Sequence, residues 1–142
     1  MAREIPIDSV DCVARPVVAI GNDYPDGHRI KPHHHRRGQL ISGASGVIAL
    51  STASGAWVMP PQRGMWIPPA TEHHVRMVGA VSVRSLYIEP GAIPGLPSHC
   101  QVVGISPFMR GLITEALSLP LEYDLEGRPG ALMQLLQYEM QQ

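Results

Sequence analysis

The chain has 142 residues, of which 44% are hydrophobic and 16% charged, and its formal net charge is −1 with the seven histidines counted as neutral. These values predict one folded domain with a real core and exclude a disordered chain. The absence of a basic excess argues against direct nucleic-acid binding by these residues. No apolar run is long enough to cross a bilayer and no apolar signal core opens the chain, so we expect a cytoplasmic protein without a membrane partner. Cys12 and Cys100 lack metal-ligand spacing and are expected to be ordinary thiols.

From about residue 15 to residue 105 the chain alternates short apolar segments with turns. Fourteen glycines and fourteen prolines in so short a chain favour strands over helices. The segments predicted as strands are 15–23, 38–42, 47–52, 56–59, 64–67, 75–78, 81–89 and 100–105. Strands this short predict a mostly β fold, an antiparallel sandwich or barrel.

The composition changes at Ser106-Pro107, which is typical of a helix start because Ser caps the helix and Pro fits its first position. The apolar residues expected on one face of this helix are Phe108, Leu112, Ile113, Ala116 and Leu117. Pro120 is expected to end it.

Residues 121–130 are interpreted as a polar connection, and residues 131–140 as a second helix. Leu132, Leu135, Leu136 and Glu139 have helical spacing in that segment. We therefore divide the chain into a β-barrel over residues 1–105 and a helical segment over residues 106–142. The second helix reaches the last residue without a capping glycine, which suggests a chain cut from something longer.

Two histidine patches carry the strongest chemical signal. His33, His34 and His35 directly precede an apolar strand, with Gln39 four residues after the last of them. In an extended segment alternate side chains share a face, so His33 and His35 are expected to point together and His34 to point away. Two imidazoles make half of a metal site, and His73 in the second patch offers a third. The pattern predicts a divalent transition metal on these three histidines.

Other interpretations of these residues stay open. The first patch could be a solvated basic loop, or the histidines could hydrogen-bond an organic effector without a metal. Gln39 could be a weak fourth ligand or a hydrogen-bonding neighbour of the ligands. His34 and His74 are expected on the surface.

The remaining candidate residues concern the barrel interior. If His73 points inward, Val75 and Met77 join it in the lumen, and His74 and Arg76 face outward. Arg36, Arg37 and Arg63 are expected to be solvated charges, although one could pair with an anionic effector. Trp57, Trp66 and the methionines are more typical of core than of a ligand cage. Among lumen positions, Met77, Trp66 and Arg37 are the candidates for contacts with a small ligand.

The two patches also resemble known motifs. Gly27, His33-x-His35, Gln39 and Gly46 resemble the first cupin motif, which normally has Glu where Gln39 stands. The segment from Pro68 to His73 is similar to the second motif, although Ala70 replaces a glycine and Met77 replaces an asparagine. The ordered phrases HHHRRGQLISGASGVIAL, VMPPQRGMWIPPATEHHV and VRSLYIEP resemble the amino-terminal sensor domain of AraC-type transcriptional regulators.

This resemblance implies a cupin-type (jelly-roll) β-barrel followed by two helices, which help the subunits of a homodimer to associate. It implies a sensor that binds a metal or small-molecule effector in the barrel. DNA would be contacted only by a carboxy-terminal pair of helix-turn-helix units beyond this chain.

Three histidines suit Zn or Ni foremost, with Fe, Co or Cu as further possibilities. An alternative is a small metal-dependent cupin enzyme, a dioxygenase or isomerase. Against an enzyme, Gln39 replaces the usual carboxylate, and Glu72 is the one candidate acid or base beside the motifs. A stand-alone binding barrel is a third, weaker interpretation.

Overall fold

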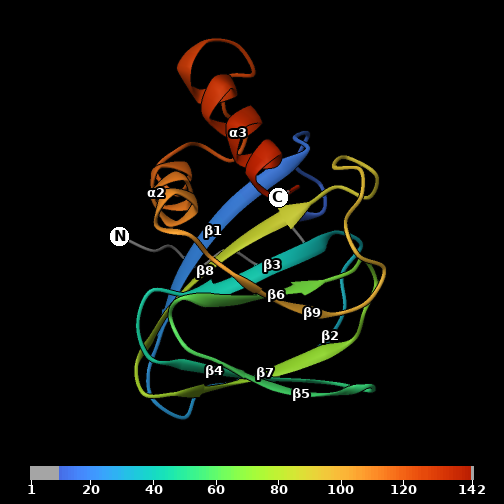
Figure 1. Cartoon of the computed structure of the whole chain (residues 1–142), viewed down its shortest axis with the longest axis vertical. Coiled ribbons are helices and arrows are strands. Elements are labelled where there is room, and N and C mark those ends of the chain that lie inside the picture. The colour runs from blue at the N-terminus through green and yellow to red at the C-terminus, as the bar shows by residue number, and fades with distance from the viewer. Residues whose placement is uncertain (1–9, 142) are drawn as a thin grey trace.

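The computed structural model describes residues 10–141, in which two antiparallel sheets face each other and two helices cover one of them (Figure 1). The five-stranded sheet has the order β1 (Val17–Tyr24), β8 (Val81–Ile88), β3 (Gly38–Gly43), β6 (Arg63–Ile67) and β9 (Gln101–Gly104). The four-stranded sheet has the order β2 (Arg29–His33), β7 (His73–Val78), β4 (Val47–Thr52) and β5 (Gly55–Met59). The helices are α2 (Pro107–Ala116) and α3 (Gly127–Glu139), and neither is long and apolar enough to cross a membrane. The predicted mostly β fold with two trailing helices is confirmed.

The lumen between the sheets is filled by apolar side chains. Along β7 the odd positions His73, Val75 and Met77 are buried and the even positions are exposed, as strand alternation predicts. Ten buried apolar residues share this lumen cluster, and none is more than 5% exposed: Ile41, Ile48, Leu50, Met59, Met65, Ile67, Val75, Met77, Val81 and Val83. The predicted lumen position of Met77 is therefore correct.

The other face of the five-stranded sheet packs against the helices (Figure 1). Leu40 pairs with Trp66 in register, and both belong to the apolar cluster that includes residues of α2 and α3. The prediction that Trp66 lines the lumen is therefore wrong. Its neighbour Ile67 takes the lumen face, so alternation turns Trp66 outward, where its indole Nε1 donates to the Pro97 carbonyl at 2.7 Å.

Helix α2 begins where the sequence indicates, because the Ser106 hydroxyl accepts a hydrogen bond from the Met109 amide at 3.0 Å. Its buried face starts at Met109, whereas Phe108 is 55% exposed. The predicted face was thus correct except at its first residue.

Helix α3 begins at Gly127, four residues before the predicted start, so the last four residues of the expected polar connection are helical. Pro129 lies in its first turn, where the missing amide hydrogen has no helical partner to lose. Met133 and Leu136 are the buried residues of α3. Leu135, which was predicted on the same face as Leu136, is 41% exposed.

Strand β2 was not among the predicted strands. It pairs with β7 at both ends, but its register shifts between Ile30 and His33, which leaves Lys31 and Pro32 in an irregularity. Pro32 cannot donate to a ladder, which explains why this segment does not have a strand-like sequence.

Gly46, the last glycine of the first motif, turns the chain between β3 and β4 with φ +68°. A Cβ at this position would lie 2.6 Å from the Ala80 carbonyl oxygen. The motif requires glycine here for both reasons.

Arg37 corrects a further prediction, because it is neither solvated nor free for a ligand. Its side chain is 1% exposed. The guanidinium donates to the carbonyls of Val13 and Arg15 at 2.7 Å each and to that of Tyr87 at 3.4 Å, and Glu89 lies at 3.4 Å. Only its Nε lacks a partner among the described residues. Arg37 therefore ties the amino-terminal segment to the five-stranded sheet.

Replacement of Leu136 by Ala should lower the free energy of unfolding by about 2–5 kcal/mol, because a fully buried side chain leaves a cavity under the helices. Replacement of the neighbouring Leu135 by Ala should change it by about 0.5 kcal/mol or less, since that side chain is largely exposed. Urea unfolding of both variants measures the difference. Equal losses would mean that α3 is rotated relative to the structure.

Replacement of Arg37 by Ala should cost roughly 3 kcal/mol of folding free energy, because several carbonyls inside the protein lose their donor. Replacement of the adjacent, exposed Arg36 by Ala should have little effect, although it removes an ion pair with Glu89. Thermal unfolding followed by circular dichroism compares the two. A stable Arg37 variant would contradict the anchoring role.

Candidate metal centre

Three histidines from the two patches meet at one end of the lumen. The ring centroids of His33 and His73 are 4.3 Å apart, those of His35 and His73 5.3 Å, and those of His33 and His35 5.7 Å. One ring nitrogen from each histidine lies within 4.8 Å of the other two. The structure therefore brings together the two patches that the sequence singled out.

Different parts of the backbone position the three rings. His33 ends β2 and is paired in register with His73, the first residue of β7. His35 lies past the end of β2, in the connection to β3, so strand alternation does not by itself explain its inward direction. His34 and His74 are exposed, as expected from the sequence.

Each ring is held by a hydrogen bond from its Nδ1 to a backbone carbonyl two residues away. The acceptors are the carbonyls of Lys31 for His33 at 2.8 Å, Arg37 for His35 at 2.6 Å and Thr71 for His73 at 2.9 Å. A carbonyl only accepts, so Nδ1 carries the proton in all three rings. Nε2 of each neutral ring is then left with its lone pair, which is the form that binds a metal.

Gln39 adds an oxygen beside the histidines. Its Oε1 lies 3.1 Å from Nε2 of His35, while its amide nitrogen donates to Ser85 Oγ at 2.9 Å and Tyr87 Oη at 3.2 Å. With Nδ1 of His35 bonded to the backbone, the lone pairs of Oε1 and Nε2 face each other, and a metal ion beside them would use both. The same amide turned by 180° would instead donate to Nε2.

Sequence reasoning missed Ser85 and Tyr87. Both are buried on β8, two residues apart, and therefore on the same face of the strand. The signal was present, since polar side chains at alternate positions of an apolar strand point to a shared partner. Burial raises the pKa of Tyr87, so its hydroxyl stays protonated and available for hydrogen bonding.

Burial also affects the pKa of two of the histidines, His33 and His73. It lowers the pKa of His73 to about 4, against a raising effect of the Thr71 hydrogen bond. Burial likewise lowers the pKa of His33. His73 is 2% exposed, whereas His33 is partly exposed and gives the cluster an open side. At neutral pH His73 is uncharged and ready to ligate.

The donor set fits a divalent transition metal. Three imidazole nitrogens and one amide oxygen suit Zn, Ni, Fe, Co or Cu, and the cluster of possible ligands contains no carboxylate. A divalent ion held only by neutral groups keeps its charge, which favours an anionic ligand at an open position.

Residues 15–137 match the family described as AraC-like ligand binding domain. The chain is also 34% identical over 110 residues to the HTH-type transcriptional regulator NimR of Escherichia coli strain K12. That alignment covers 78% of this chain and 40% of NimR, so the match extends over less than half the length of this relative.

Solved structures share the fold at low identity. ToxT K231A of Vibrio cholerae, in its apo form, matches 89% of this chain and 54% of its own with a TM-score of 0.65 and 6% identity. A putative glyoxylate induced protein of Pseudomonas aeruginosa matches 63% of this chain and 36% of its own, with a TM-score of 0.54 and 15% identity. A cupin superfamily protein of Desulfitobacterium hafniense matches 63% of this chain and 74% of its own, with a TM-score of 0.50 and 12% identity.

Three observations point to the same family: the strand order of the two sheets, the two helices that follow them, and the family match over most of the chain. This chain belongs to the family of AraC-like ligand-binding domains and has the cupin-like barrel that its two motifs predicted.

Proposed function

We propose that this chain is the sensor domain of an AraC-type transcriptional regulator and that it holds a divalent transition metal, Zn or Ni foremost, on His33, His35 and His73. The observation that carries the proposal is that all three rings donate through Nδ1 to the backbone, which leaves three converging nitrogens for one ion. When bound, the metal supplies a positive centre for an anionic ligand. DNA is contacted by a half of the regulator beyond this chain.

A signal from this centre needs a physical route to the helices, and β3 offers one. Gln39 lies on the lumen side of β3 beside His35, and the next residue, Leu40, packs in the cluster shared with α2 and α3. A ligand that draws Gln39 toward the histidines therefore acts on a strand that the helices rest on. Such a signal requires that the metal binds one arrangement more tightly than the other.

The helices also offer a surface for self-association. Phe108 on α2 and Leu135 and Tyr138 on α3 are large apolar side chains that remain exposed. Exposed apolar side chains of this kind support the proposal of a homodimer formed through the helices.

The family favours a binding role over an enzymatic one. Glu72, the candidate acid or base beside the motifs, is exposed although His73 next to it is buried. Its exposure gives no support to general acid–base chemistry at the centre.

Single replacement of His33, His35 or His73 by Ala should weaken zinc binding by at least about 100-fold, because each removes one of three ligands. Isothermal titration of the metal-free protein with zinc and nickel measures the affinity. Replacement of His34 or His74 by Ala is the matched control, since both side chains are adjacent in sequence and exposed. If the control variants lose as much affinity as the other three, the proposed ligand set is wrong.

Gln39 provides a second test of the centre. Replacement by Glu should tighten zinc binding by about 10-fold or more, because a carboxylate neutralises the ion. Its second oxygen can accept from the Ser85 and Tyr87 hydroxyls, in place of the hydrogen bonds that the Gln39 amide donates to them. Replacement by Leu should weaken binding, since the oxygen is lost. If all three residues at this position give the same affinity, Gln39 takes no part in metal binding.

A further inference from the structure

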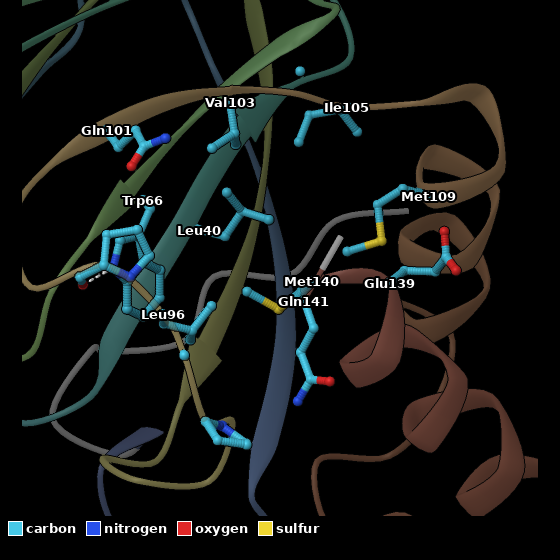
Figure 2. Close-up of a pocket in the computed structure, with 14 residues that line it drawn as sticks. Leu40, Trp66, Leu96, Gln101, Val103, Ile105, Met109, Glu139, Met140 and Gln141 are labelled. Atoms are coloured by element: carbon cyan, nitrogen blue, oxygen red, sulfur yellow. Dashed lines mark hydrogen bonds between the residues drawn. The ribbon is translucent and has the colours of Figure 1, made fainter.

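A cavity of about 470 Å³ lies on the opposite side of the five-stranded sheet from the histidines. It is bounded by β3, β6 and β9, by the loop over residues 94–97 and by the ends of α2 and α3 (Figure 2). We call it the seam cavity because it lies where the barrel meets the helices. Its volume is within the range of small-molecule sites, about 300–1,000 Å³.

The walls of the seam cavity are mostly apolar and come from both sides of the seam. Figure 2 shows Leu40, Trp66 and Val103 on the strand side, with Met109 and Met140 on the helix side. The indole N–H of Trp66 is already bonded to Pro97, so the ring is left to offer apolar surface. Methionine side chains adapt to the shape of a guest. These walls suit an aromatic or aliphatic body.

One charged side chain, Glu139, lines the seam cavity. It makes no ion pair with any other described residue. The carboxyl end of α3 adds partial negative charge at the same place, because the last carbonyls of a helix lack helical partners. Both features favour a cationic group and disfavour an anionic one.

The lumen offers an organic molecule less room. The apolar side chains of the lumen are at most 5% exposed, so they fill the barrel below the histidines. The polar end of the lumen is taken by the histidines, Gln39 and their hydrogen bonds. Within the described residues, the seam cavity is therefore the better place for an organic effector.

We propose that the seam cavity binds an amphipathic organic cation, with its apolar body between Trp66 and the two methionines and its ammonium group near Glu139. The binding itself does not depend on the proposed metal; its role as an effector rests on the proposed function. A molecule in this position contacts the sheet and both helices at once. It thereby favours the arrangement in which the end of α3 lies against the barrel.

Three ligands with one apolar body and different head groups test the proposal: 4-phenylbutylamine, 4-phenylbutan-1-ol and 4-phenylbutyrate. Titrations use a Trp57→Phe variant, in which Trp66 is the one remaining tryptophan and reports on the seam cavity. Calorimetry gives the affinities independently. We expect the amine to bind more tightly than the alcohol, and the carboxylate to bind about 10-fold or more weakly than the amine.

Substitutions test the charge of Glu139 and the space in the seam cavity separately. Glu139→Gln should bring the affinities of amine and alcohol close together. Val103→Trp, which fills the seam cavity from β9, should abolish binding by calorimetry, and Met140→Trp should do the same from the helix side. Val58→Trp is the matched control, because Val58 is exposed on the four-stranded sheet and lies outside this cavity. It should bind the amine as the parent does.

The proposal is overturned if none of the three ligands binds, if the carboxylate binds as tightly as the amine, or if binding survives both filling variants with their far-ultraviolet spectra unchanged. Zinc titration of the same samples keeps the two proposals apart. His73→Ala should lose zinc and keep the amine, whereas Val103→Trp should keep zinc and lose the amine. Loss of the amine with His73→Ala would place its site at the histidines instead.

Discussion

The hydrogen bond from an imidazole Nδ1 to a backbone carbonyl is the interaction on which the proposed metal centre depends. It occurs three times, each time to a carbonyl two residues away from the histidine. Because the carbonyls belong to the strands and their connections, the fold itself fixes both the tautomer and the direction of each ring. A bound metal ion would meet three rings that are already oriented, because the entropy cost of ordering them is incurred when the chain folds.

The five-stranded sheet links this centre to the rest of the molecule. Its inner face carries Gln39, Ser85 and Tyr87 toward the histidines, and its outer face carries Leu40 and Trp66 toward the helices. Strand alternation therefore places two different environments, one polar and one apolar, on opposite faces of the same sheet. The metal ion and the organic cation proposed above would share this sheet, so each would influence the affinity of the other reciprocally.

Much of this arrangement was predictable because it depends on local patterns. Alternation predicted most strands, Ser106-Pro107 predicted the start of α2, and motif spacing paired His33 and His35 with His73.

The predictions that failed have physical causes beyond local sequence pattern. Strand pairing, which the sequence does not reveal, decided that Trp66 faces the helices. Packing against the sheet buried Met133 together with Leu136 and left Leu135 exposed. Arg37 is buried because carbonyls distant in sequence surround it. The carbonyls that orient the histidines belong to the backbone, so no residue type in the sequence marks them.

The central claim is that one metal ion is shared by Nε2 of His33, His35 and His73 while their Nδ1 atoms remain bonded to the backbone. A crystal structure of the zinc-loaded protein, with anomalous diffraction measured on both sides of the zinc absorption edge, tests it most directly. We expect one anomalous peak bound by Nε2 of all three rings, with the Lys31, Arg37 and Thr71 carbonyls still accepting from Nδ1. Coordination through Nδ1, a peak that omits one of the three rings, or no peak in the barrel would contradict it.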